Sequence, residues 1–161
     1  MTRHPNRCRR GAAAVEAAIL LPFVVFLAAI AVDWARLLYY TITLDNVARG
    51  GALAACDKEA WLKNPLNPTQ TPYPAAFPGT AAQQTLLTNA ALAEAPNLDR
   101  TPTVTAASLA DGGDGYPAVV VTATMPFTTF TNYTYGKLFG VEHTRTLTRR
   151  VQMRVAPEAP Q

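Results

Sequence analysis

Glu16 is a carboxylate inside the long apolar run from Ala12 to Val32, and it is the only charged residue of that run. An ionised side chain at the centre of a bilayer costs roughly 2.5 to 3.5 kcal/mol, so a carboxylate in such a segment favours a functional role. Because Glu16 lies near the start of the run, the alternative is that it reaches the membrane edge and pairs with Arg9 or Arg10.

Residues that could carry catalysis are scarce. Beyond Gly11, the chain holds one histidine, one serine and one cysteine, namely His143, Ser108 and Cys56. A Ser-His-Asp or Cys-His site would have to use this one histidine together with the one serine or the one cysteine. His143 belongs to a strand-like pattern of exposed residues. The sequence therefore predicts no catalytic residue, no cofactor and no enzyme.

A metal site is also not expected. Asp111 and Asp114 flank glycines, but their spacing is not that of an EF-hand loop and the closing glutamate is absent. The same composition is typical of a tight turn between two strands, which is the interpretation we favour.

The formal net charge of +3 comes from the N-terminus. Four arginines precede Gly11, and the rest of the chain holds 14 − 4 = 10 basic residues against 11 acidic ones. This distribution does not favour a nucleic-acid partner.

The run from Ala12 to Val32 is 21 residues long. As a helix it would extend about 31 Å, which matches a hydrocarbon core of roughly 30 Å. Basic flanks stay on the cytoplasmic side, so the sequence predicts a cytoplasmic N-terminus. Cys8 and Cys56 would then lie on opposite sides of the membrane and could not form an intramolecular disulfide.

Two other targeting signals compete with a spanning helix. Ala29-Ile30-Ala31 resembles a signal-peptidase site, although an apolar signal region is typically about 7 to 15 residues long. Arg9-Arg10 is a weak match to a twin-arginine signal. A secreted or membrane-anchored binding domain with a conventional signal is therefore the alternative function.

With Gly11 as the last leader residue and Ala12 as the first residue after it, Glu16 occupies position five. In this arrangement the sequence resembles the TadE-like family of tight-adherence (Flp) pilus pseudopilins. The residues that carry the resemblance cover about the first third of the chain: Arg9-Arg10-Gly11, Val15-Glu16, Leu21-Pro22, Asp33, Arg36-Leu37-Leu38-Tyr39 and Asn46-Val47-Ala48-Arg49. Ala17 departs from the aromatic residue that often follows the glutamate.

The resemblance implies cleavage between Gly11 and Ala12 by a prepilin peptidase. It also implies that Glu16 pairs with the new amine of an adjacent subunit and that Pro22 serves helix kinking or packing. The implied role is a minor pseudopilin of the bacterial inner membrane, with membrane lipid, other pilins and the inner-membrane assembly platform as partners.

Beyond the membrane, the helix is expected to continue as an amphipathic spine. Its apolar stripe is predicted to hold Leu37, Leu38, Tyr40, Thr41, Leu44, Val47, Ala48 and Gly51 to Ala55. Gly50-Gly51 is either a bend or a position of close packing, and we favour packing. Trp34, Tyr39 and Tyr40 are typical of an interfacial aromatic belt or of packing.

The remaining elements are a second short helix and a small sheet. The helix is expected over residues 81–95, entered at Thr80 and stopped by Pro96, with Leu86, Leu87, Ala90 and Ala91 on one face. Strands are expected over residues 103–109, 119–127 and 141–155. The predicted class is α+β: a leader (1–11), a transmembrane helix (12–32) and a pilin-like extracytoplasmic domain (33–161) with an antiparallel sheet.

Overall fold

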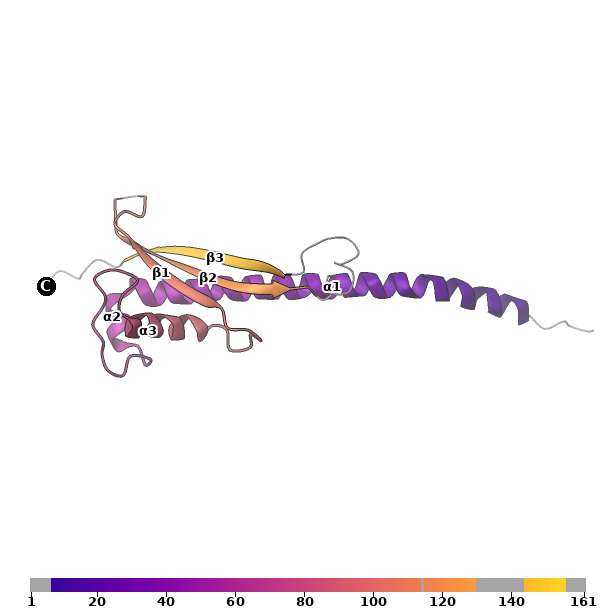
Figure 1. Cartoon of the computed structure of the whole chain (residues 1–161), viewed down its shortest axis with the longest axis horizontal. Helices are drawn as coiled ribbons and strands as arrows, with labels where there is room; N and C mark the ends of the chain where they lie inside the picture. Colours follow the sequence, from indigo (N-terminus) through magenta and orange to yellow (C-terminus); the bar gives the residue numbers. More distant parts are fainter. Residues whose placement is uncertain (1–6, 114, 130–143, 156–161) are drawn as a thin grey trace, which may run out of the picture. The chain divides into compact units, whose positions relative to one another are not determined.

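The structure is a computed structural model, and it describes residues 7–113, 115–129 and 144–155. Its elements are α1 (Arg7–Cys56), α2 (Lys58–Lys63), α3 (Ala81–Leu92), β1 (Thr103–Leu109), β2 (Ala118–Thr128) and β3 (Thr144–Arg154). Figure 1 shows the long helix α1, the shorter helices and the three strands. The predicted α+β class, with a long N-terminal helix, a second short helix and a small antiparallel sheet, is confirmed.

The chain divides into two compact units. The first comprises residues 1–37 and 128–143, and the second comprises residues 38–127 and 144–161. Helix α1 contributes residues to both units and continues without interruption through Pro22 and Gly50-Gly51. The glycine pair is therefore not a bend.

One face of α1 forms the centre of the second unit. Its fully buried residues recur at intervals of three or four, as expected for a helix packed on one side. They are Leu44, Val47, Ala48, Ala52 and Ala55. Two members of the predicted stripe are wrong, because Leu38 and Leu53 are 57% and 53% exposed. The angle of 100° per residue places Leu53 on the side of the helix opposite to the core and Leu38 beyond the margin of the buried face.

Gly51 lies at a point of close packing. A Cβ atom at Gly51 would lie 3.1 Å from Val121 of β2 and 3.2 Å from Ala91 of α3. Three elements therefore meet at one backbone position, and the absence of a side chain there allows the close approach.

The three strands form one sheet in the order β1-β2-β3. β1 pairs with β2 in an antiparallel register that places Thr103 opposite Thr124 and Leu109 opposite Ala118. β3 runs back along the other side of β2 (Figure 1). The odd-numbered residues of β2 from Val119 to Phe127 are buried, so the predicted alternation is confirmed.

The bounds of the predicted strands agree with the structure to within a few residues. β1 has the predicted limits, and β2 is one residue longer at each end. In β3 the polar residues alternate with Leu147, Val151 and Met153, as predicted, but these apolar residues are only half-buried. Residues 141–143 of the predicted third strand lie outside the described residues.

Helix α3 begins at a capping box. The Thr80 side chain accepts from the backbone N–H of Gln83, and the Gln83 side chain accepts from the backbone N–H of Thr80. Of the predicted face, Leu87 and Ala91 are buried whereas Leu86 and Ala90 are half-exposed. The helix ends at Leu92, before the predicted Ala95, and Ala93 to Ala95 continue as a turn before Pro96.

Helix α2 was not predicted from the sequence. Asp57 caps it by accepting hydrogen bonds from the backbone N–H groups of Glu59 and Ala60. Its Trp61 is 2% exposed and packs edge-on against Tyr73 and Phe77, with ring centroids 6.0 and 6.1 Å apart. This aromatic cluster packs the proline-rich segment, residues 65–78, into the core of the second unit.

The two outer edges of the sheet differ. On the β1 edge, the Ser108 backbone N–H donates to the Phe77 carbonyl at 3.2 Å, and the Gln84 side-chain amide donates to the Val104 carbonyl at 3.2 Å. The segment at Phe77 and helix α3 therefore cover the β1 edge. β3 is the last strand on the other side of the sheet.

Candidate membrane segment and assembly site

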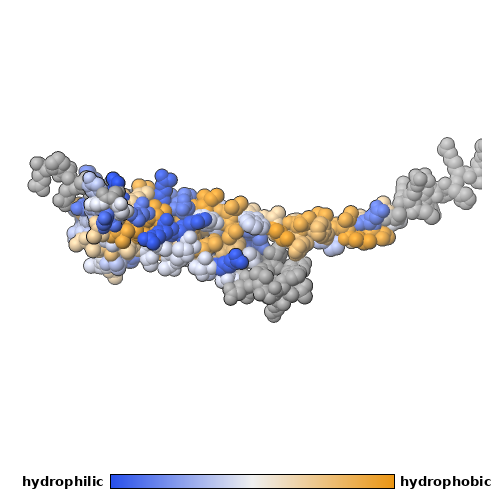
Figure 2. Space-filling view, turned by 90° about the horizontal axis from the view of Figure 1, so that it is seen from above, coloured by the Kyte–Doolittle hydropathy of each residue, from blue (hydrophilic) through white to orange (hydrophobic). Residues whose placement is uncertain are grey.

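The N-terminal part of α1 carries apolar side chains on all sides. From Ala13 to Val32 no residue is buried, and Leu20, Phe23 and Val24 are each about 60% exposed. Figure 2 shows this end of the helix as an almost continuous hydrophobic surface. By length and composition this part of α1 is a candidate membrane span, because a helix that is apolar all round needs an apolar environment.

Glu16 lies on this surface, and its side chain is exposed. The neighbouring Val15 and Ile19 are 61% and 70% exposed, so the helix surface around Glu16 is apolar and exposed. Positions 12 and 16 are four residues apart and therefore share one face of α1, about 6 Å apart along the axis. The helix thus places residues 12 and 16 on one side of α1.

Gly11 lies within the first turns of α1 and is exposed. A Cβ atom built on it would meet no other atom within 4 Å. Its backbone is accessible from the side on which a side chain would project. Pro22 is also exposed, and its missing N–H does not end the helix.

Asp33 follows the apolar run and is buried, at 6% exposure. Its carboxylate is 3.8 Å from the Arg36 guanidinium, one turn further along α1. From the sequence, Asp33 and Arg36 contribute to the TadE-like resemblance, and no burial of Asp33 is predicted. A buried carboxylate that is followed by half-buried Leu37 and exposed Leu38 does not stand out in the hydropathy pattern.

The aromatic residues after the run separate into two kinds. Trp34 and Tyr39 are 62% and 49% exposed, whereas Tyr40 is 9% exposed. Tyr40 packs on Phe127 with ring centroids 5.6 Å apart, and its hydroxyl donates to Asp99 at 2.8 Å. Tyr40 therefore serves packing, and only Trp34 and Tyr39 have the exposure of interfacial residues.

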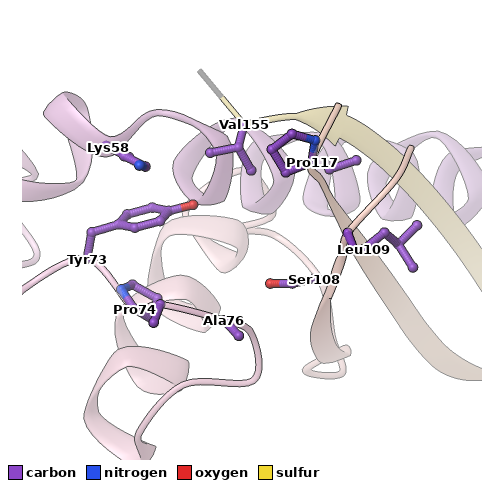
Figure 3. Close-up of a pocket in the computed structure, with 11 residues that line it drawn as sticks. Lys58, Tyr73, Pro74, Ala76, Ser108, Leu109, Pro117 and Val155 are labelled. Carbon is purple, nitrogen blue, oxygen red and sulfur yellow. The ribbon is translucent and has the colours of Figure 1, made fainter. Parts of the chain in front are cut away.

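A groove of about 660 Å³ lies in the second unit near the C-terminal end of β3. Figure 3 shows Lys58 and Tyr73 on one side and Ser108, Pro117 and Val155 among its other lining residues. The Tyr73 hydroxyl donates to the Ala55 carbonyl, and the Ser108 hydroxyl oxygen accepts from the Phe77 N–H at 2.7 Å. Both hydroxyls therefore have structural partners.

The residues considered for catalysis are not brought together among the described residues. Ser108 lies in the groove, whereas Cys56 ends α1 and donates to the Leu53 carbonyl at 3.4 Å. His143 lies outside the described residues. Burial raises the pKa of the Cys56 thiol, and the Asp57 carboxylate raises it further, which disfavours the thiolate needed for a nucleophile.

The turn considered for a metal has a structural explanation. The Asp111 carboxylate accepts from the backbone N–H groups of Gly113 and Gly115, each at 2.7 Å. Gly113 and Gly115 both have positive φ. Within the described ranges, which omit Asp114, no group of three or more His, Cys, Asp or Glu residues could hold a metal ion.

The comparisons with known proteins give one match. No curated protein and no solved structure matches the chain. A family model described as "TadE-like protein" matches residues 11–53. The match begins at Gly11, contains Glu16 and Pro22, and ends within the buried part of α1. Residues 11–53 of this chain are therefore a TadE-like segment, as the sequence resemblance indicated.

Proposed function

We propose that this protein is a minor pseudopilin, a structural component of a tight-adherence pilus or a related secretion system. The observation that carries the proposal is the coincidence of the TadE-like match with the exposed apolar part of α1. TadE-like proteins are associated with tight-adherence pili and are structural components, so the match favours a structural role over an enzymatic one.

In this proposal the N-terminal part of α1 crosses the bacterial inner membrane once. Four arginines precede Gly11, which favours a cytoplasmic N-terminus and an extracytoplasmic second unit. Trp34 and Tyr39 are exposed just after the apolar run and suit the membrane–water interface.

A prepilin peptidase then cuts between Gly11 and Ala12. The exposure of Gly11 and the open space around it support access by such an enzyme. The cut removes the arginines, keeps the apolar helix and leaves a free amine on Ala12.

The Glu16 carboxylate pairs with the Ala12 amine of an adjacent subunit. Both groups lie in an apolar layer, so each charge reduces the cost of burying the other. A subunit displaced along the membrane normal would leave one charge unpaired, at a cost of several kcal/mol. The pair therefore fixes the axial position of neighbouring subunits, which are other pilins held on the inner-membrane assembly platform.

The first experiment is to determine the N-terminus and the intact mass of protein isolated from the membrane fraction. A chain that starts at Ala12 supports the proposal. A start at Val32 identifies an ordinary signal peptide and contradicts it, because Glu16 is then absent from the mature protein. An intact Met1 start leaves a simple membrane anchor.

A second experiment tests the ion pair. Glu16→Leu is expected to insert into the membrane and to be processed, but to be lost from complexes purified with the pilus machinery. Glu16→Asp keeps the charge and is expected to retain part of the assembly. Glu59→Gln, an exposed carboxylate of α2, is the matched control. Normal incorporation of Glu16→Leu would exclude the pairing.

A further inference from the structure

The outer edge of β3 is open in the described part of the chain, whereas the outer edge of β1 is covered by Phe77 and Gln84. β3 is 11 residues long and contains neither proline nor glycine. Charged side chains on an edge strand oppose pairing with apolar or like-charged strands, so the charges that β3 carries decide which partner strand it can accept.

The direction of the β3 backbone groups follows from one hydrogen bond. The N–H of Val155 donates to the Pro117 carbonyl at 3.0 Å, so this amide points toward the β2 side. Successive residues of a strand direct their backbone groups to alternating sides. The even-numbered residues from Thr144 to Gln152 therefore direct their N–H and carbonyl groups to the open edge.

The side chains along this edge are strongly basic. Between Thr144 and Val155 there are four arginines and no acidic residue, and all four are exposed. Arg154 lies over the Tyr116 ring at 5.2 Å. The alternation places Arg145 and Arg149 on one face of the strand and Arg150 on the other. An added strand would therefore meet positive charge on both of its faces.

The inner face of β3 is also incompletely covered. Leu147, Val151 and Met153 are half-buried, whereas the corresponding residues of β2 are buried. An added strand with apolar residues at alternate positions would extend this face and remove more of their surface from water.

We propose that the outer edge of β3 binds an extended acidic segment of a partner protein as a fourth strand. Backbone hydrogen bonds to the even-numbered residues supply the pairing, and carboxylates opposite the arginines supply the selectivity. A second copy of β3 is disfavoured because it would place arginines opposite arginines. This proposal does not depend on the membrane role.

The test uses the full chain in detergent micelles and a fluorescent peptide of about ten residues in which Glu alternates with Val. Binding is measured by fluorescence anisotropy at low ionic strength. A peptide with Gln in place of Glu is expected to bind at least about tenfold more weakly. Amide hydrogen exchange at Thr146, Thr148 and Arg150 is expected to slow when the Glu peptide binds.

Two pairs of variants separate strand addition from simple charge attraction. Thr148→Pro removes one outward N–H and keeps the bonds to β2, and Thr148→Ala is its matched control. The proline variant is expected to bind at least about tenfold more weakly than the alanine variant. Arg145→Glu with Arg150→Glu is expected to abolish binding, whereas lysine at both positions retains it.

Three results would overturn the proposal. Equal affinity of the Thr148→Pro and Thr148→Ala variants would show that no strand is added. Equal affinity for the Glu and Gln peptides would show that the partner segment need not be acidic. Self-association that Thr148→Pro abolishes would identify a second copy of this chain as the occupant.

Discussion

Cys56 lies at the end of α1, where burial and the adjacent Asp57 both raise the pKa of its thiol. We predict that Asp57→Asn lowers this pKa, because it removes the negative charge and keeps a side-chain oxygen that can cap α2. At a fixed pH below the thiol pKa, the variant therefore has more thiolate and is alkylated faster. The pH dependence of Cys56 modification by iodoacetamide, followed by peptide mass spectrometry, measures the change.

Glu59→Gln is the control for this experiment, because it removes another α2 carboxylate that does not contribute to the Cys56 shift. Its rate profile is expected to match that of the unmodified chain. A profile for Asp57→Asn that is unchanged or moves to higher pH would contradict the electrostatic explanation.

Asn67 organises the proline-rich segment after α2. It is 3% exposed, its amide donates to the Trp61 and Thr71 carbonyls, and its oxygen accepts from the Thr71 N–H at 2.8 Å. Asn67→Ala removes these hydrogen bonds and leaves the Thr71 N–H without its partner, whereas the Trp61 and Thr71 carbonyls keep other donors, so we predict a loss of about 1 to 3 kcal/mol in the free energy of unfolding. Chemical denaturation measures the loss.

The exposed Asn89 of α3 provides the matched control. Asn89→Ala removes the same side chain from the protein surface and is expected to change stability by less than about 0.5 kcal/mol. Equal effects of the two substitutions would show that the Asn67 hydrogen bonds do not hold the segment.

At the scale of elements, Gly50 and Gly51 are adjacent in α1, but the atoms that surround them differ. A Cβ at Gly50 would meet the flexible Glu94 side chain at 2.7 Å, whereas one at Gly51 would meet core atoms of Val121 and Ala91. We predict that Gly50→Ala stabilises the chain by up to about 1 kcal/mol through helix propensity. Gly51→Leu is predicted to destabilise it by about 1 to 3 kcal/mol or more through overpacking.

Gly50→Leu is the matched control for size, because its side chain projects toward the surface where Glu94 is exposed. The difference between the two leucine variants in urea denaturation measures the packing at Gly51. If both variants unfold at the same urea concentration, close contact at Gly51 does not limit packing.

The sequence predicted those elements whose local signals agree with their environment. Alternation of apolar residues with Thr122 and Thr124 identified β2, and Thr80 identified the start of α3. The same reasoning missed α2, because a helix of six residues is too short to show a helical periodicity in the sequence. It also assigned Leu38 and Leu53 to the core, because hydrophobicity alone does not determine which side of a helix is covered.

The candidate site at Glu16 is a prediction from the sequence. Glu16 in an apolar run is conspicuous in sequence, and the structure adds that its surroundings are exposed. The groove near Tyr73 and the open edge of β3 could not be predicted, because each depends on contacts between residues distant in sequence.

At the scale of the whole molecule, the second unit contains its own core. We predict that a chain starting at Leu38 folds without detergent and has a thermal midpoint within about 4 °C of the full chain. Circular dichroism measures both. A chain starting at Asp45 lacks the buried Tyr40 and Leu44 and is the control, with a lower midpoint expected. A much lower midpoint for the Leu38 chain would show that earlier residues stabilise the second unit.

The difference between the two sheet edges has a consequence for stoichiometry. Head-to-tail polymerisation through strands needs two complementary free edges on every molecule, one to offer and one to receive. In the described part of the chain, the Phe77 carbonyl and the Gln84 side chain already bond to the β1 edge, so β3 is the edge that remains for a partner strand. Under the proposal, strand addition at β3 is therefore expected to end after one partner and to give a one-to-one complex instead of an open-ended fibre.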